Sequence, residues 1–143
     1  MAFSVVLTLA AALAAKAPVE AVNKNGEGIA IKGYDPVAYF TKAEPVKGSA
    51  QFAHHWMGAT WWFATAEDRD LFVKDPDKCS PQFGGYCSWA VSNNNTADID
   101  PTARKIVDGK LYLNYSKSVQ KMWEKDLNKR IEDANRNWPA LHK

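Results

Sequence analysis

The strongest constraint on the fold of this chain is a pair of strand patterns, each closed by a short turn that contains glycine. Residues 104–107 and 110–115 flank Asp108-Gly109, a dipeptide typical of the type I′ turn of a β-hairpin. Gly58 supplies the turn of an earlier pair, residues 50–56 and 60–64. Strands joined by such short turns run antiparallel. The sequence therefore predicts a small antiparallel sheet of β-hairpins.

A long amphipathic helix is predicted over residues 117–137, with Ser116 as its N-cap. Four apolar residues recur there at every fourth position and form a core stripe: Val119, Trp123, Leu127 and Ile131. Lysines recur at the same spacing on the opposite side, at positions 117, 121, 125 and 129. They indicate a solvated face rather than a basic surface for an acidic partner or a membrane. Trp138-Pro139 is expected to end this helix.

A shorter helix is predicted between Thr65, its N-cap, and Asp75-Pro76. Residues 76–95 that follow are irregular, because Pro81 and Gly84-Gly85 require unusual backbone conformations. Together with the hairpins, the helices define an α+β fold. A small antiparallel sheet of hairpins packs against helices, and the long amphipathic helix lies at the C-terminus.

The length of the chain indicates a single domain, and its N-terminal segment indicates an exported protein. The 143 residues carry 18 Lys+Arg against 16 Asp+Glu, a net charge of +2 that is too small to indicate a nucleic-acid partner. No apolar run reaches the roughly 20 residues of a transmembrane segment. Residues 1–15 predict an export signal, residues 16–28 a linker and residues 29–140 the domain. The expected location is periplasmic or secreted.

No catalytic motif of the GxSxG, P-loop, HExxH or GxGxxG type occurs in the sequence, so we expect no enzyme. The candidates for metal binding are the Cys87 thiol and the His54 and His55 imidazoles, which are natural ligands for copper or zinc. Asp35 is a further candidate, as a carboxylate ligand at a turn. Each residue has a structural alternative: a buried thiol, a half-buried and a solvent-facing strand histidine, and an Asx-turn.

Aromatic residues make up 12% of the chain, with six Trp among them, and they suggest a second kind of site. Most are expected in the core, while a few leave an indole or hydroxyl at the rim of a cleft. The candidates for lining such a ligand pocket are Trp61, Trp62, Tyr86 and Trp89. The two cysteines, Cys79 and Cys87, allow a single disulfide in an oxidising compartment.

Five segments in order resemble the exported, single-domain YHS proteins of bacteria. They are KGYDPVAYF (32–40), GATWWF (58–63), AEDRDLF (66–72), PQFGGYC (81–87) and DGKLYLNY (108–115). The resemblance covers residues 29–140 and implies a metal-binding module. The chain departs from the wider family at Ala38, where the first cysteine would stand, and at Ala64, Asp68 and Arg69, where the later cysteine chemistry would be.

The resemblance leaves Cys87 as the remaining matched thiol. Cys79 stands where relatives usually have a tyrosine, so a Cys79–Cys87 disulfide would be peculiar to this protein. We therefore expect an exported YHS-like domain that binds or traffics copper or zinc, with Cys87 as principal ligand. The alternative is a non-catalytic domain that binds a small ligand or a protein in an aromatic cleft. Neither nucleic acid nor a transmembrane segment is expected.

Overall fold

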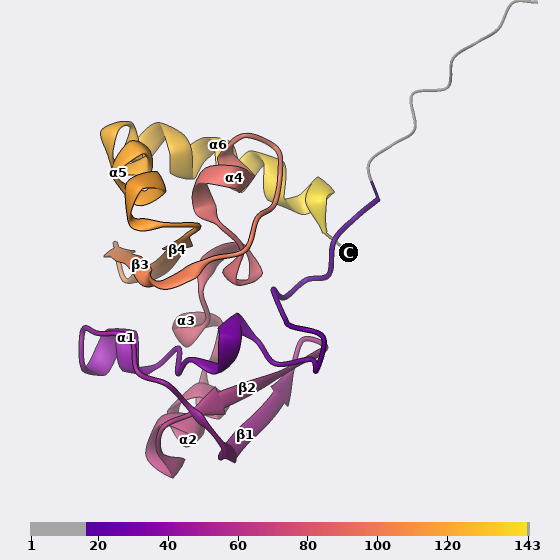
Figure 1. Cartoon of the computed structure of the whole chain (residues 1–143), viewed down its shortest axis with the longest axis vertical. Coiled ribbons are helices and arrows are strands. Elements are labelled where there is room, and N and C mark those ends of the chain that lie inside the picture. Colours follow the sequence, from indigo (N-terminus) through magenta and orange to yellow (C-terminus); the bar gives the residue numbers. More distant parts are fainter. Residues whose placement is uncertain (1–16, 143) are drawn as a thin grey trace, which may run out of the picture.

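The computed structural model describes residues 17–142 and shows an α+β fold, as predicted (Figure 1). The export signal predicted for residues 1–15 lies outside the described residues. Six α-helices, two 3-10 helices (η) and four strands follow one another in this part of the chain. They are η1 (Ile31–Gly33), α1 (Ala38–Thr41), β1 (Ser49–Trp56), β2 (Ala59–Phe63), α2 (Ala66–Lys74), α3 (Pro76–Cys79), η2 (Gln82–Gly85), α4 (Ser88–Ser92), β3 (Asp100–Val107), β4 (Lys110–Asn114), α5 (Lys117–Lys125) and α6 (Leu127–Leu141).

Both predicted hairpins form, but as two separate two-stranded antiparallel sheets rather than one sheet. Asp108 and Gly109 join β3 to β4 with φ of 51° and 74°, as a type I′ turn requires. The turn between β1 and β2 has two residues, Met57 and Gly58, with φ of 54° and 75°. It is thus one residue shorter than the sequence suggested, because Ala59 already pairs with Trp56.

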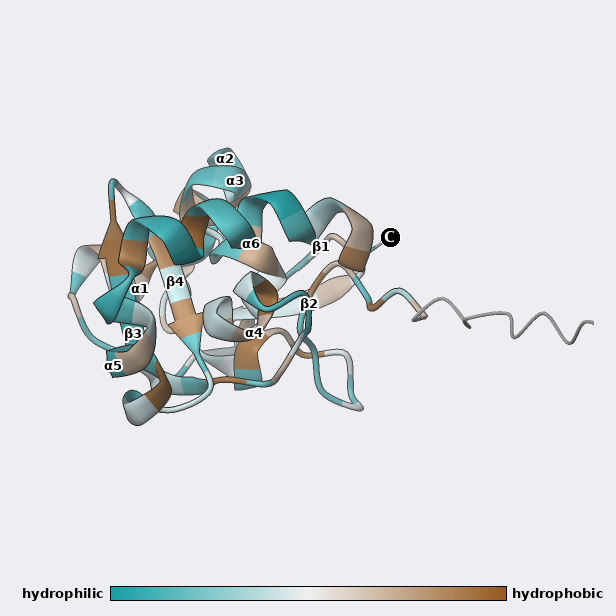
Figure 2. Cartoon of the chain, turned by 90° about the horizontal axis from the view of Figure 1, so that it is seen from above, coloured by the Kyte–Doolittle hydropathy of each residue, from teal (hydrophilic) through white to brown (hydrophobic). Residues whose placement is uncertain are grey.

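The hairpins lie in two halves of the molecule that share one core. The N-terminal lobe (residues 29–80) contains β1, β2 and α1–α3, and the C-terminal lobe (residues 81–142) contains β3, β4 and α4–α6 (Figure 1). One buried cluster joins both lobes, because Trp61 and Phe72 of the first pack in it with Leu111 of the second. A second cluster around Trp123 lies within the C-terminal lobe. Figure 2 shows α6 as largely hydrophilic.

The predicted C-terminal helix is interrupted. Asp126, with φ −128° and ψ 46°, separates α5 from α6, so the expectation of one helix over residues 117–137 was wrong. On the two sides of the break, α5 contacts β3 and α4, and α6 packs along α4. Trp138-Pro139 does not end the helix either, since α6 continues to Leu141. Trp138 is held there by ring contacts with Phe83 and Tyr86.

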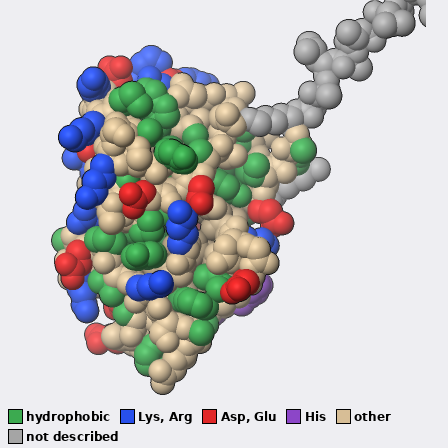
Figure 3. All heavy atoms as spheres, in the orientation of Figure 1, with side chains coloured by type: hydrophobic (Ala, Val, Ile, Leu, Met, Phe, Trp, Pro, Cys, Tyr) green, Lys and Arg blue, Asp and Glu red, His purple; other side chains and the backbone are tan. Residues whose placement is uncertain are grey.

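The N-caps predicted from sequence are confirmed. The Thr65 hydroxyl oxygen accepts the Asp68 backbone N–H at 3.1 Å, and Ser116 accepts that of Val119 at 3.1 Å. No helix among residues 17–142 is long and apolar enough to cross a membrane. On the face drawn in Figure 3, basic side chains crowd one edge and acidic side chains lie among them. This distribution agrees with the small net charge of +2.

The segment expected to be a linker belongs to the folded domain. Val19 bridges to His142, and the Asn23 backbone N–H donates to Gly84 O at 2.8 Å. The Ile31 N–H in turn donates to Asn23 O at 3.0 Å, and Val22 is only 3% exposed. Residues 19–25 therefore connect the two lobes along one side of the molecule.

Candidate functional site

Cys87, the principal metal candidate, is a buried structural thiol. It precedes α4 and is 1% exposed. Its Sγ accepts the Tyr115 backbone N–H at 3.2 Å and lies 3.7 Å from Asn114 Oδ1. Burial is the main cause that raises the pKa of this thiol above its ordinary value. Because the thiolate is the form that binds metals, this environment disfavours ligation.

The other metal candidates do not face Cys87. His54 makes an edge contact with Phe72, at 6.3 Å between ring centroids, while His55 is exposed beside Thr60. The two imidazoles thus sit on opposite faces of β1, as the alternation predicted. Asp35 is fully buried. Its Oδ1 accepts the N–H groups of Val37 and Ala38 at 2.9 and 3.2 Å, and its Oδ2 accepts that of Ala64 at 2.9 Å.

These donors do not fit a copper or zinc site. Among the described residues, no group of three or more His, Cys, Asp or Glu side chains could hold a metal ion. The Asp35 oxygens are already occupied by backbone N–H groups in an Asx-turn, which is the structural alternative for this residue. Cys79 and Cys87 are both free thiols, so no disulfide joins them in this structure.

We therefore predict that the purified chain, equilibrated with Zn²⁺ or Cu⁺ and desalted, retains well below one equivalent of metal by elemental analysis. Cys87→Ser should leave that content unchanged. It should lower the free energy of unfolding by about 1–3 kcal/mol, because it puts a hydroxyl into a buried site. Stoichiometric metal that disappears in Cys87→Ser would contradict this prediction.

The aromatic residues proposed for a pocket are dispersed. Trp61 is buried between the hairpin and α2, and Trp62 covers Gly33. The Arg130 guanidinium lies over Trp89, 3.9 Å from the ring centroid, in a cation–π contact. Tyr86 packs against Trp138, with 5.9 Å between ring centroids. Of the four proposed residues, Trp61 is the one that lines the cleft described next.

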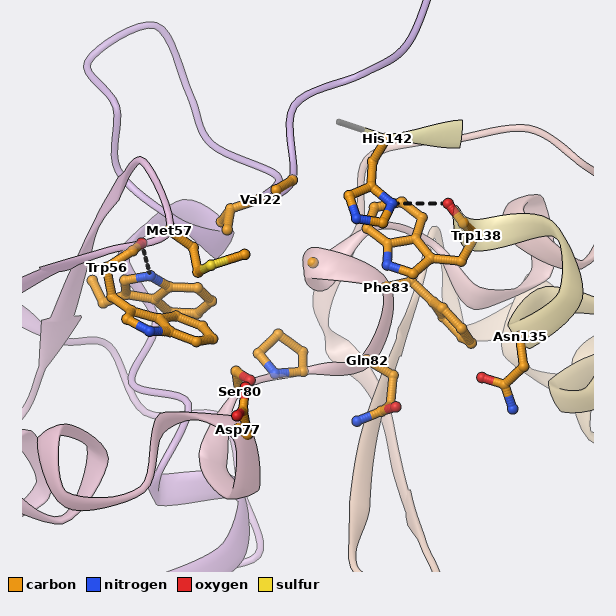
Figure 4. Close-up of a pocket in the computed structure, with 14 residues that line it drawn as sticks. Val22, Trp56, Met57, Asp77, Ser80, Gln82, Phe83, Asn135, Trp138 and His142 are labelled. Atoms are coloured by element: carbon orange, nitrogen blue, oxygen red, sulfur yellow. Dashed lines mark hydrogen bonds between the residues drawn. The ribbon is translucent and has the colours of Figure 1, made fainter. Parts of the chain in front are cut away.

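A cleft of about 310 Å³ opens between the two lobes (Figure 4). We call it the interlobe cleft. Trp56 and Met57 form one side and Phe83, Trp138 and His142 the side opposite, as Figure 4 shows. Residues at the base and rim complete the lining: Ala21, Val22, Trp61, Asp77, Ser80, Pro81, Gln82, Gly84 and Asn135.

Three consecutive residues with positive φ position Phe83 in this cleft. Phe83, Gly84 and Gly85 have φ of 57°, 62° and 83°, a run that glycine permits and phenylalanine rarely adopts. Gly84 lies so close to residues 21–23 that a Cβ would fall 1.9 Å from Ala21 O. A Cβ on Gly85 would clash with the Ile31 side chain, and Ile31 itself has a φ of 40°. Strained backbone of this kind persists where the surroundings enforce it, often at binding sites.

Different contacts hold the side chains on the two sides of the cleft. On the C-terminal lobe the His142 ring stacks on Trp138 at 4.1 Å and 14°, and His142 Nδ1 donates to Trp138 O at 2.8 Å. On the N-terminal lobe Trp61 Nε1 donates to Trp56 O at 3.1 Å and fixes the base of the hairpin turn. Met57, at the tip of that turn, is 54% exposed.

The polar groups of the cleft suit binding better than catalysis. Gln82 and Asn135 side chains make no hydrogen bond with other residues of the described range, so their amides are available to a ligand. Among residues 17–142, no lysine or arginine lines the cleft, and Asp77 supplies a carboxylate. In this part of the chain, neither the Ser80 hydroxyl nor any thiol is hydrogen-bonded to His142.

Sequence reasoning missed Trp56, Met57, Phe83, Trp138 and His142 as site residues. The breaker-rich segment 81–85, whose two glycines had no other explanation, was a signal for Phe83 alone. His142 could not be found from sequence, because its position near the C-terminus suggested a frayed end. Comparisons with protein-family models, with curated proteins and with solved structures found no match to this chain.

Proposed function

We propose that this chain is an exported, single-domain YHS-type module that binds a small organic ligand in the interlobe cleft without transforming it. The observation that carries the proposal is that aromatic side chains line both sides of this cleft, and that the Gln82 and Asn135 amides also line it. The volume of about 310 Å³ lies at the lower end of the range for small-molecule sites. Because both sides are held by hydrogen bonds and ring stacking, the cleft exists before any ligand arrives.

The lining favours a ligand with a flat ring and hydrogen-bonding groups. The Trp56 and Trp138 rings offer faces on which such a ring can stack. The Met57 thioether makes a favourable contact with the edge of an aromatic ring. Gln82 and Asn135 can both donate and accept hydrogen bonds. Since Asp77 is a carboxylate of the cleft and no lysine or arginine of residues 17–142 lines it, a neutral or cationic ligand is favoured over an anionic one.

The test is a titration with small heteroaromatic fragments, followed by the indole N–H signals in two-dimensional NMR spectra. We expect the signals of Trp56, Trp61 and Trp138 to shift, while Trp123, which is buried and does not line the cleft, stays constant. Met57→Asn should weaken binding about two- to tenfold by removing the thioether contact. Asparagine suits the left-handed backbone at this position, where φ is 54°, so the fold should be retained.

Met122→Asn is the matched control. Met122 is 41% exposed on α5 and outside the cleft lining, so this change should leave fragment affinity unchanged. Shifts distributed over all six indoles, or equal affinity of the Met57→Asn variant and the parent chain, would contradict the proposal.

A further inference from the structure

A second cavity, of about 430 Å³, lies in the N-terminal lobe between α1, α2 and α3. We call it the α1–α3 groove. It shares no lining residue with the interlobe cleft, so it is a separate site. Its apolar lining consists of Val37, Phe40, Leu71 and Cys79.

The apolar floor of this groove is incompletely covered by the protein. Leu71 is 43% exposed, although leucine is most often buried. Phe40 and Cys79 are partly buried and pack against the shared core, so the floor continues into that core. The Cys79 thiol has its pKa raised, chiefly by burial, and is therefore an apolar lining group rather than a nucleophile. A hydrocarbon chain placed here removes apolar surface of both molecules from water.

The rim of the groove carries a positive charge. Lys74 and Lys78 line it at the junction of α2 and α3, together with Asp75. Asp75 Oδ1 accepts the Lys78 backbone N–H at 3.3 Å as the N-cap of α3. Within residues 17–142, neither lysine ammonium forms an ion pair, and two ammonium groups outnumber one carboxylate. The rim can therefore accept an anion.

We propose that the α1–α3 groove binds a free, medium-chain aliphatic carboxylate. Its chain lies on the floor formed by Val37, Phe40 and Leu71. Its carboxylate meets the ammonium groups of Lys74 and Lys78 at the rim. The lysine methylenes extend the apolar wall while their charged ends remain in water, as is usual for long basic side chains. An uncharged or cationic amphiphile cannot form the ionic contact with the lysine ammonium groups.

The experiment is an NMR titration of the full chain with hexanoate, octanoate and decanoate below their micellar concentrations. The backbone signals of Leu71 and Cys79 should shift, while the Trp138 indole signal in the interlobe cleft should not. Each added pair of methylenes should tighten binding about four- to fifteenfold until the groove is filled. Octanol and octylammonium should bind more weakly than octanoate, and added salt should weaken octanoate alone.

The double variant Lys74→Gln/Lys78→Gln should lose about three- to tenfold in octanoate affinity and keep its octanol affinity. Lys121→Gln/Lys125→Gln on α5 is the matched control and should bind octanoate as the parent chain does. Equal binding of octanoate and octylammonium would overturn the proposal, as would an unchanged octanoate affinity in the groove variant. Shifts confined to the cleft indoles would overturn it too, and would leave the ligand proposed for that cleft to be judged separately.

Discussion

Gly84→Ala is expected to lower the free energy of unfolding by about 2–5 kcal/mol, a large effect for the addition of one methyl group. The new Cβ would lie 1.9 Å from Ala21 O and 3.2 Å from Val22 Cα, so residues 21–23 must move. That movement breaks the hydrogen bond from Asn23 N–H to Gly84 O, which is 2.8 Å long. Alanine is also disfavoured at a φ of 62°.

Gly109→Ala separates the two causes. Gly109 has a φ of 74°, but nothing lies within 4 Å of the place where its Cβ would be. This variant should lose only about 1 kcal/mol, the backbone cost common to both positions. Denaturant unfolding of the two variants and the parent chain measures the difference. Equal losses of unfolding free energy in the two variants would show that residues 21–23 do not pack tightly against Gly84. The explanation given for the position of Phe83 would then be wrong.

The stability of the protein is expected to fall as the pH rises from about 4 to 7, because Asp35 and Asp68 form a buried carboxyl pair. Asp35 is 0% and Asp68 8% exposed, and their side chains are hydrogen-bonded. Burial first, and then this hydrogen bond, raises the pKa of Asp35 from 3.8 to about 7. A carboxyl–carboxyl hydrogen bond requires a proton, which Asp35 holds in the folded chain and gives up in the unfolded chain.

The direction of the pH effect follows from that difference. Between pH 3.8 and about 7 the folded chain binds the Asp35 proton and the unfolded chain does not, so raising the pH favours unfolding. The full contribution is present below pH 3.8 and is lost once the pH passes about 7. Its upper limit is about 4 kcal/mol, since one pKa unit corresponds to about 1.4 kcal/mol. Asp98 and Asp100 have lowered pKa values and act with the opposite sign, but only below pH 3.8.

Asp68→Asn should flatten this pH profile. The amide donates a hydrogen bond to the Asp35 carboxylate without a proton and removes the neighbouring charge, so the pKa of Asp35 falls. Asp70→Asn is the matched control on the same helix, because Asp70 is exposed and should leave the slope unchanged. Urea unfolding at pH 4.5, 6 and 7.5 provides the measurement. A parent chain whose stability is flat or rises over this interval would refute the shared proton.

The local parts of the fold followed from sequence because their causes are local. Asp108-Gly109 specifies a turn by backbone conformation alone. Thr65 and Ser116 cap helices through hydrogen bonds to residues three positions further along the chain. The interruption at Asp126 had no such cause. The apolar stripe runs through it unchanged, and in the folded chain α5 contacts β3 while α6 packs mainly along α4.

The same distinction applies to the candidate sites. Asp35 is an Asx-turn residue and Cys87 is a buried thiol. Both were among the structural alternatives considered from the sequence. The residues proposed as metal ligands carry suitable donor atoms, but the fold directs them to different neighbours. The α1–α3 groove and the interlobe cleft were not visible from sequence, since each is lined by segments that become neighbours only when the chain folds.

The sequence by itself thus determined the α+β class, both hairpins, the starts of α2 and α5 and the chemical types available for function. The tertiary structure alone decided that the hairpins form two sheets, that residues 19–25 join the lobes and that Trp56 faces Trp138 across a cleft. The physical reason is the separation along the chain between the residues that interact. Turns and caps are governed by interactions over two to four residues, whereas clefts depend on side-chain packing between segments far apart in the chain.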